Sequence, residues 1–305
     1  MTGPRIALGR HEARFALDAV TAGGGAVVPL SDSPDALVWL DETVAGLAEE
    51  LAKAPSVRWV QLPLAGVEDF VASGLIDRQR LWTCAKGAYG KTVAEHALAL
   101  MLAGLRHLRT RIGARSWGAP AGTTLYGQRI AILGGGGITA ALLELLAPFR
   151  VEATVVRRRL EPVANASHTV SISELNEVLP GSVAVVLALA LTPETTGIIG
   201  AAELALMDRS AWLINVARGR HVDTEALVAA LEEESIGGAA LDVTEPEPLP
   251  DGHRLWDLPN CIITPHTADT VEMSVPDLVE RIRTNVSRFA TGQTLVGLVD
   301  PETGY

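Results

Sequence analysis

The chain repeats one pattern along most of its length, in which a short apolar run is followed by a loop and then by apolar residues at helical spacing. Apolar runs without alternation are typical of strands buried on both faces, and the helices between them indicate parallel sheets covered on both sides. In the first third of the chain, such runs predict strands at 6–8, 26–29, 37–40, 57–62 and 81–84.

A second series of strands and helices begins near Arg129. Its apolar runs predict strands at 130–133, 153–156, 183–189, 212–216, 239–243 and 262–264. Six strands joined by helical crossovers form a doubly wound sheet. A final helix is expected at about 275–290. The pattern therefore predicts two α/β domains.

A long helix is expected to join the two series, starting near Thr92, where Thr92 and Glu95 have the spacing of a capping box. The residues that follow are apolar nearly all round, which is typical of a helix buried under a second domain or in a subunit interface. A Gly- and Pro-rich link at 117–122 marks a domain junction.

Composition agrees with two globular domains, because 305 residues exceed the length of a typical single domain. The 25 cationic and 36 acidic residues give a net charge of −11, which argues against a nucleic-acid partner. The longest apolar run, at 183–191, is far shorter than the roughly 20 residues of a membrane-spanning helix. Cys84 and Cys261 form neither a disulfide framework nor a zinc-ligand set. We expect a cytoplasmic protein with no membrane partner and no metal.

The strand predicted at 130–133 runs straight into a glycine loop, GGGGIT at 134–139, and a helix follows. In that context Gly134 permits a tight turn and Gly136 lets a pyrophosphate approach the backbone. Gly137 and Ile138 then begin the helix, whose first amides attract a phosphate. The loop predicts a dinucleotide site, although Thr139 occupies the third glycine position of the motif and demands more room.

The end of the next predicted strand bears on the choice of cofactor. It reads VVRRR at 155–159 and lacks the carboxylate that would accept a hydrogen bond from the 2′-hydroxyl of NAD. Arg157 and Arg158 suit the 2′-phosphate of NADP instead, because a guanidinium binds phosphate with two hydrogen bonds. We predict a preference for NADP(H), with NAD(H) as a possible substitute. The alternative is a solvated charge run, since arginine is the usual cation of this chain.

Three polar residues each follow an apolar strand of the second series: Arg218, Glu247 and His266. Ligands of open parallel sheets bind beyond the carboxyl ends of the strands, so we expect these residues at the same edge as the glycine loop. A histidine exchanges protons near neutral pH, a carboxylate orients its ring, and an arginine clamps a substrate carboxylate. Together they suit hydride transfer to a carbonyl carbon.

Several motifs now resemble one family, the D-isomer-specific 2-hydroxyacid dehydrogenases. They are VAEH at 93–96, Trp117, LTPET at 191–195, NVARG at 215–219, ALDV at 240–243, EPLP at 247–250, PN at 259–260, TPH at 264–266 and the closing Gly304 and Tyr305. They span nearly the whole chain in the family's order and spacing. The resemblance implies two Rossmann-like or flavodoxin-like doubly wound parallel-sheet domains with a cleft between them.

The resemblance also implies a role for each matching residue. His266 would be the acid/base, Glu247 its partner and Arg218 the clamp for the substrate carboxylate. Further cofactor contacts would come from Thr192, Val216 and Asp242, with Asp242 holding the nicotinamide carboxamide. The amides of Ala65 and Gly66 would bind the substrate carboxylate.

Three positions depart from the family pattern. Leu64 stands in place of the first glycine of the substrate loop, and Asp269 stands where a glycine usually follows the histidine. Arg157 replaces the aspartate of many members, which supports the preference for NADP(H). Arg218, Glu247 and His266 are all present.

We therefore predict a substrate-binding domain made of residues 1–90 and 285–305, and a dinucleotide-binding domain at 91–284. The helix from Thr92 and the neighbouring link resemble the family's dimer surface, which predicts a homodimer. His96 is assigned to a helix face or an interface, and the histidines at 107, 168, 221 and 253 carry no signal.

The predicted activity is the interconversion of a small 2-oxo acid and its D-2-hydroxy acid, as in a glyoxylate or hydroxypyruvate reductase. One alternative is a short 3-phosphoglycerate dehydrogenase. Another, of a different class, is a non-catalytic dinucleotide-sensing protein. Side-chain specificity depends on loops of the first domain, so the sequence does not identify the substrate.

Overall fold

The structure is a computed structural model that describes residues 3–9, 13–41 and 43–301. The chain divides into a smaller unit, Met1–Tyr89 with Thr270–Tyr305, and a larger unit, Gly90–Asp269. The boundary predicted at 284/285 would cut helix α11 (Val271–Thr291), which belongs as a whole to the smaller unit, so the second boundary lies at 269/270. Gly304 and Tyr305 lie outside the described residues.

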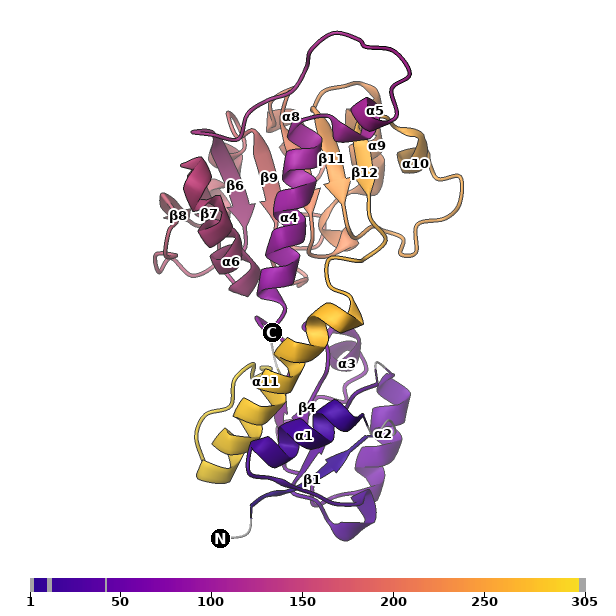
Figure 1. Cartoon of the computed structure of the whole chain (residues 1–305), viewed down its shortest axis with the longest axis vertical. Coiled ribbons are helices and arrows are strands. Elements are labelled where there is room, and N and C mark those ends of the chain that lie inside the picture. The colour runs from indigo at the N-terminus through magenta and orange to yellow at the C-terminus, as the bar shows by residue number, and fades with distance from the viewer. Residues whose placement is uncertain (1–2, 10–12, 42, 302–305) are drawn as a thin grey trace. The chain divides into compact units, whose positions relative to one another are not determined.

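The smaller unit contains a sheet in the order β2-β1-β3-β4-β5, in which every neighbouring pair of strands is parallel (Figure 1). Its strands are β1 (Arg5–Leu8), β2 (Ala26–Val27), β3 (Ala36–Val38), β4 (Trp59–Gln61) and β5 (Leu81–Thr83). Its helices are α1 (Arg14–Ala22), α2 (Val44–Lys53), α3 (Glu68–Ala72) and α11. The order is that of flavodoxin-like sheets. All five strands predicted for this part are confirmed.

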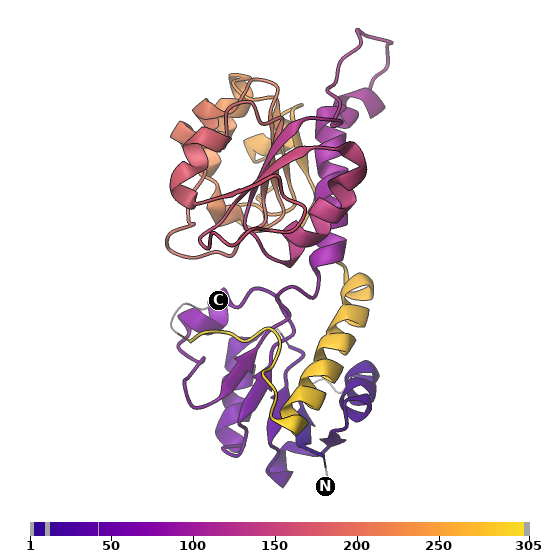
Figure 2. The ribbon, with the colours of Figure 1, turned by 90° about the vertical axis from the view of Figure 1, so that its left-hand side faces the viewer.

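Helix α11 completes the smaller unit by packing along α1, as both views show (Figures 1 and 2). Its residues Leu278, Ile282 and Val286 are buried in one cluster with Ile6 and Val20. The apolar face of α11 is thus used inside this unit.

A buried hydrogen-bond network ties α11 to the same sheet. Asn285 donates from Nδ2 to Gln61 Oε1 and to the Val296 carbonyl, both at 2.9 Å, and its Oδ1 accepts from the Val296 amide at 2.8 Å. Gln61 also accepts from the Thr83 hydroxyl, which accepts from the Trp59 indole, each at 2.8 Å. These side chains are fully buried, so their hydrogen bonds fix one arrangement of helix and sheet.

The larger unit contains a second sheet, in the order β12-β11-β10-β9-β6-β7-β8, again with parallel neighbours. Its strands are β6 (Arg129–Leu133), β7 (Glu152–Val156), β8 (His168–Val170), β9 (Ala184–Leu187), β10 (Trp212–Asn215), β11 (Gly238–Leu241) and β12 (Cys261–Ile263). Its helices are α4 (Gly90–Leu105), α5 (Leu108–Ile112), α6 (Gly137–Leu146), α7 (Leu175–Val178), α8 (Ala201–Leu206), α9 (Thr224–Glu232) and α10 (Arg254–Asp257). The order reverses between β6 and β9, which is the point where doubly wound sheets bind their ligands.

The six strands predicted for this unit are confirmed, and β8 is a seventh that the sequence did not predict. β8 spans three residues, His168 to Val170, at the edge of the sheet beside β7. It has no apolar run, because an edge strand is only partly covered and His168 is exposed. A strand formed by pairing alone leaves little signal in the hydrophobic pattern.

Helix α4 starts at Gly90, so Thr92 lies within its first turn and does not begin the helix as predicted. A side chain at Gly90 would meet the backbone of Gly137 at 2.8 Å, so a glycine here allows the close packing of α4 on α6. α4 lies on α6, β10 and β11, and Figure 1 shows α4 and α6 together in front of the strands. Its apolar surface therefore covers the sheet of its own unit.

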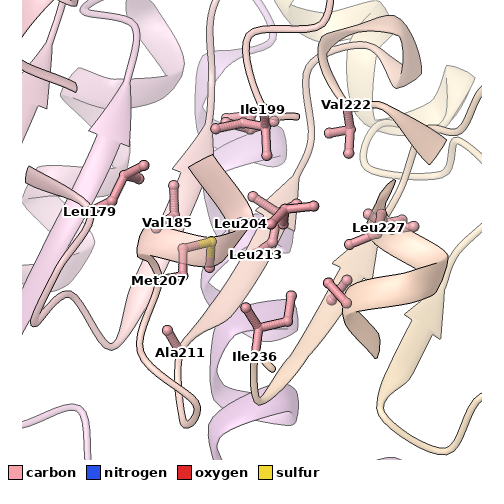
Figure 3. Packing of buried hydrophobic residues seen from close by; sticks show 14 of the residues in the cluster. Leu179, Val185, Ile199, Leu204, Met207, Ala211, Leu213, Val222, Leu227 and Ile236 are labelled. Carbon is pink, nitrogen blue, oxygen red and sulfur yellow. The ribbon is translucent and has the colours of Figure 1, made fainter. Parts of the chain in front are cut away.

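The opposite face of this sheet is covered by α8 and α9. Val185 of β9 and Leu213 of β10 pack in one cluster with Leu204 of α8 and Leu227 of α9 (Figure 3). Within the described part of the chain, no helix is both long and apolar enough to span a bilayer.

Candidate active site

Two polar residues that follow neighbouring strands meet directly. His266 follows β12 in the segment 264–268, here called the His266 turn, and Glu247 lies in the loop after β11. His266 Nδ1 is 2.5 Å from Glu247 Oε1, and the two side chains are 48% and 38% exposed. A carboxylate can only accept, so Nδ1 carries the hydrogen and Nε2 is the ring atom left for a ligand.

The His266 turn has a backbone that needs outside support. His266 has a φ of +51°, in the left-handed region that costs energy for any residue other than glycine. Its amide donates to the carbonyls of Asp242 and Thr264, at 2.8 and 2.9 Å. The amides of Thr267 and Ala268 donate to the Asp242 carboxylate at 2.9 and 3.0 Å. Asp242, at the end of β11, therefore holds the turn in place.

The Asp242 carboxylate itself is only 1% exposed. Burial alone would raise the pKa of Asp242, but hydrogen bonds from His96, Thr264 and the turn amides outweigh it and hold the pKa below its ordinary value. Groups of the protein itself therefore surround the Asp242 carboxylate. The predicted contact of Asp242 with the nicotinamide carboxamide stays a prediction.

Arg218 follows β10 and is held by its neighbours in the chain. Asn215, which is buried, donates from Nδ2 to the Arg218 carbonyl at 2.9 Å and accepts from the Ala217 amide at 3.1 Å. A side chain at Gly219 would lie 1.9 Å from the Thr244 carbonyl oxygen, so only glycine permits this approach to the segment after β11. The close approach of Gly219 to Thr244 brings the segment that carries Arg218 to the loop that carries Glu247.

The pKa of Asp269 responds to the charges of His266, Asp242 and Arg218. Burial raises the pKa of its carboxyl and the charge of Asp242 raises it further, whereas the positive charges of His266 and Arg218 act in the opposite direction. All three neighbours therefore lie close enough to Asp269 for their charges to matter. Asp269, which stands where the family usually has glycine, therefore lies near the predicted catalytic residues His266 and Arg218.

The glycine loop fits a dinucleotide. Gly134, at the end of β6, has a φ of +108°, and a side chain there would lie 2.1 Å from the Ala188 carbonyl oxygen at the end of β9. The loop is thus at the point where the strand order reverses. A side chain at Gly136 would meet nothing within 4 Å, so open space lies before α6. The first amides of that helix, Gly137 and Ile138, have no partner within the helix and suit a pyrophosphate.

Thr139 fits beneath this loop although the motif has glycine there. Its side chain is fully buried, and its hydroxyl donates to the Gly134 carbonyl at 2.8 Å. The hydroxyl is therefore satisfied and links the helix to the tight turn, which is how the structure accommodates the larger residue.

Arg157 lies along the glycine loop. A side chain at Gly135 would come within 3.0 Å of Arg157 Cδ and Nε. The charge of Arg158 acts instead on Glu194, whose pKa is lowered first by a hydrogen bond from the Thr192 side chain and only slightly by Arg158. The structure thus places Arg157 beside the loop, and the phosphate contacts of Arg157 and Arg158 stay predictions.

Val216 directly follows β10, and Thr192 lies in the loop after β9. The Thr192 amide donates to the Thr195 hydroxyl at 2.8 Å, which braces the loop 190–196. Val216 is buried, and its amide approaches the Leu187 carbonyl at 3.4 Å. β9 adjoins the reversal point and β10 lies next to β9, so both residues follow strands near the glycine loop, as a cofactor-lining role requires.

Ala65 and Gly66 belong to the smaller unit, in the loop between β4 and α3. Ala65 is exposed there, at the carboxyl end of a strand. Their part in substrate binding stays a prediction.

Two histidines have structural contacts that sequence reasoning missed. His96, on α4, reaches Thr264 Oγ1 at 2.9 Å and Asp242 Oδ1 at 3.3 Å. His221 is fully buried, with Nδ1 2.9 Å from the Thr195 carbonyl oxygen and Nε2 3.3 Å from that of Leu189. It thus links the loop 190–196 to the segment after Arg218. Both contacts join segments far apart in the sequence, so no local pattern could have indicated them.

The cysteines and potential metal ligands suggest no further chemistry. Burial raises the pKa of the Cys84 thiol, and it raises the pKa of Cys261 to about 12. Both are free and buried. Among the residues that the structure describes, no three His, Cys, Asp or Glu side chains gather as a metal site.

Known proteins are similar to this chain in sequence and in fold. The sequence model of the NAD binding domain of the D-isomer specific 2-hydroxyacid dehydrogenases matches residues 96–268. The chain is 39% identical over 268 residues to a Corynebacterium melassecola protein described as uncharacterized and in the proB 3′ region, covering 85% of this chain and 88% of that one. It is 31% identical over 266 residues to a glyoxylate reductase of Pyrococcus furiosus, covering 83% and 79% of the two chains.

A solved structure resembles the whole chain. It is a D-isomer specific 2-hydroxyacid dehydrogenase from Xanthobacter autotrophicus Py2 in complex with NADPH and MES, with a TM-score of 0.84, 28% identity and full coverage of both chains. This chain belongs to the D-isomer specific 2-hydroxyacid dehydrogenase family. It is therefore an NAD(P)-dependent oxidoreductase built from two parallel-sheet α/β domains.

Proposed function

We propose that this enzyme reduces a small 2-oxo acid of the glyoxylate or hydroxypyruvate type to the D-2-hydroxy acid, with NADP(H) as its preferred cofactor. The observation that carries the proposal is the 2.5 Å contact of His266 Nδ1 with Glu247 Oε1. These residues follow β12 and β11 at the edge of the parallel sheet where β6 runs into the glycine loop. The similarity to a glyoxylate reductase supports the substrate class.

The proposed roles follow from the donors and charges of this chain. The bound nicotinamide supplies the hydride. The imidazolium form of His266 keeps Nδ1–H on Glu247 and gives its Nε2 proton to the carbonyl oxygen as that oxygen becomes a hydroxyl. Arg218 pairs with the substrate carboxylate and fixes the neighbouring carbonyl. In the oxidative direction, neutral His266 takes the proton back at Nε2.

The preference for NADP(H) rests on the position of Arg157 beside the glycine loop. A 2′-phosphate on the ribose would meet a guanidinium there, and β7 ends without the carboxylate that suits a free 2′-hydroxyl. The NADPH complex of the Xanthobacter relative agrees with this choice. We assign Arg157 the main contact and Arg158 a minor one.

We also propose that the enzyme is a cytoplasmic homodimer. The segment between α5 and β6 extends away from the larger unit (Figures 1 and 2), and Trp117 and Ile112, in and before it, are 98% and 80% exposed. Large apolar side chains this exposed are typical of a surface that another protein covers. Two free, buried cysteines suit a reducing compartment. A monomer at micromolar concentration in light scattering would contradict the dimer.

A panel of substrates tests the activity. The enzyme is assayed with glyoxylate, hydroxypyruvate, pyruvate and phosphohydroxypyruvate, each with NADPH and NADH. We expect turnover of the unphosphorylated acids, abolished in His266→Ala while NADPH binding, followed by its fluorescence, is retained. A preference for phosphohydroxypyruvate would favour the phosphoglycerate dehydrogenase alternative. Cofactor binding without any turnover would favour the dinucleotide sensor.

A further inference from the structure

The Asp242 carboxylate collects donors from two parts of the larger unit. Three come from the His266 turn: the Thr264 hydroxyl at 2.6 Å and the amides of Thr267 and Ala268. The fourth comes from His96 on α4, whose Nε2 lies 3.3 Å from Asp242 Oδ1. His96 is thus the one member of this set outside the turn and its neighbouring strand.

The hydrogen atoms in this cluster can be assigned from the contacts. Thr264 has one hydroxyl hydrogen, and it points to Asp242 Oδ1. The 2.9 Å contact between Thr264 Oγ1 and His96 Nε2 then requires Nε2 to carry the hydrogen. His96 therefore donates to Thr264 and Asp242 together, and the arrangement holds whether the imidazole is neutral or charged.

We propose that His96 is a positioning residue for the acid/base of the reaction. The left-handed backbone at His266 persists only because its surroundings hold it. The His266 amide donates to the backbone carbonyl of Asp242, and the next two amides donate to the Asp242 carboxylate. His96 restrains Asp242 and Thr264 from the side of α4. Through them it keeps the His266 ring on Glu247 with Nε2 free for the substrate. The assignment rests on the proposed function for the chemistry at His266.

These residues lie close in sequence to the two points where the chain passes between the units. The chain passes between the two units at Tyr89–Gly90 and again at Asp269–Thr270. His96 lies in the second turn of the helix that starts at the first passage, and the His266 turn ends just before the second. The contact of His96 with Thr264 and Asp242 joins these two segments inside the larger unit.

Kinetics of three variants test the proposal. His96→Leu removes the donor, His96→Gln keeps an N–H near the position of Nε2, and His168→Leu makes the same substitution at the exposed edge strand β8. We expect kcat to fall about tenfold to a hundredfold in His96→Leu, because a small misplacement of a catalytic group has that effect. The KM for the 2-oxo acid and the Kd for NADPH should change less than about threefold. His96→Gln should recover most of kcat, and His168→Leu should equal wild type.

A spectroscopic readout works without turnover. In ¹⁵N-labelled protein, the nitrogen shifts of His96 should report the hydrogen on Nε2, and those of His266 the hydrogen on Nδ1. His96→Leu should change the His266 signals while the unfolding temperature stays close to that of wild type. If no 2-oxo acid is reduced, the proposed function fails, but these signals still decide the role of His96.

Thr264→Val gives a second route to the same answer. It removes the acceptor of the His96 N–H and one donor to Asp242, so it should lower kcat as His96→Leu does, and the double variant should be little worse than either. Unchanged kcat and unchanged His266 signals in His96→Leu would overturn the proposal. So would an equal loss of kcat in the Leu and Gln variants, or losses that multiply in the double variant.

Discussion

His266 and Glu247 form a hydrogen-bonded pair, with Nδ1 2.5 Å from Oε1, although 18 residues separate them in the chain and they follow different strands of the sheet. The pair predicts a large effect of Glu247→Gln. The neutral amide would bind the imidazolium more weakly and could present its NH₂ to the ring, which turns Nδ1 away. We expect kcat to fall about a hundredfold, as is typical when the partner of an acid/base is lost.

A nearby carboxylate provides the control for this variant. Glu245 is exposed in the same loop, so Glu245→Gln removes the same charge without touching His266. It should leave kcat within about twofold of wild type. The Kd for NADPH should be unchanged in both variants, since neither residue lies at the glycine loop. Equal losses in the two variants would mean that the net charge of the loop matters and the contact does not.

The position of Arg157 beside the glycine loop predicts a change in cofactor choice. Arg157→Ser removes the guanidinium and should raise the KM for NADPH about tenfold, which corresponds to one charge-assisted hydrogen-bond pair with phosphate. The KM for NADH should stay the same or fall. Arg159→Ser is the matched control, because Arg159 is exposed at the end of the same run. Parallel kinetics with both cofactors check the prediction, and an equal rise for NADH would contradict it.

The hydrophobic pattern predicts most of the fold because strands buried on both faces must be continuously apolar. That condition holds for β3 and β9, whose residues are all apolar and buried, and fails for β8, which pairs at the edge. The division inside α11 was misplaced because a helix pattern shows which face is buried but not which unit buries it. The start of α4 was misplaced because Gly90 packs closely on Gly137, a contact that the local sequence pattern does not show.

The sequence could indicate those parts of the candidate site that depend on strand ends. The contact of Glu247 with His266 could be expected because polar residues after buried strands share one edge of a parallel sheet. The roles of Arg218, Glu247 and His266 stay predictions. The contacts of His96 and His221 could not be expected, since each depends on a crossing of two distant segments. The effect of Asp269 was equally hidden, because the shift in its pKa comes from burial and from three charges that the sequence does not place.

The buried network around Asn285 predicts that a substitution at this residue lowers the stability of the fold without removing a catalytic group. Asn285→Ala would leave Gln61 Oε1 with one donor fewer and the Val296 amide and carbonyl without these partners. We expect a loss of about 2–4 kcal/mol in the free energy of unfolding, the range for breaking a buried hydrogen-bond network. Denaturant unfolding measures it. Asn176→Ala, at an exposed position of α7, should cost less than about 0.5 kcal/mol.

The raised pKa of Asp269 predicts how stability depends on pH. Burial favours the protonated carboxyl in the folded state, and the charge of Asp242 adds to this, while His266 and Arg218 only partly oppose it. As pH rises from the ordinary value of 3.8 to the raised folded value, the unfolded chain loses the proton first, so the free energy of unfolding falls across that window. Above that window, and therefore at neutral pH, the folded protein carries the full free-energy cost of the ionised Asp269 carboxylate.

Asp269→Asn removes that penalty and should therefore stabilise the protein at pH 7, by on the order of 0.5 kcal/mol after solvent screening of a partly exposed group. Below pH 3.8 both proteins carry a neutral side chain at this position, so their unfolding temperatures should converge. Asp251→Asn, at an exposed position, should show no such pH-dependent difference. Thermal unfolding of the three proteins across this pH range decides the matter. A stabilisation of Asp269→Asn that is the same at every pH would mean that shape, and not the carboxylate charge, is the cause.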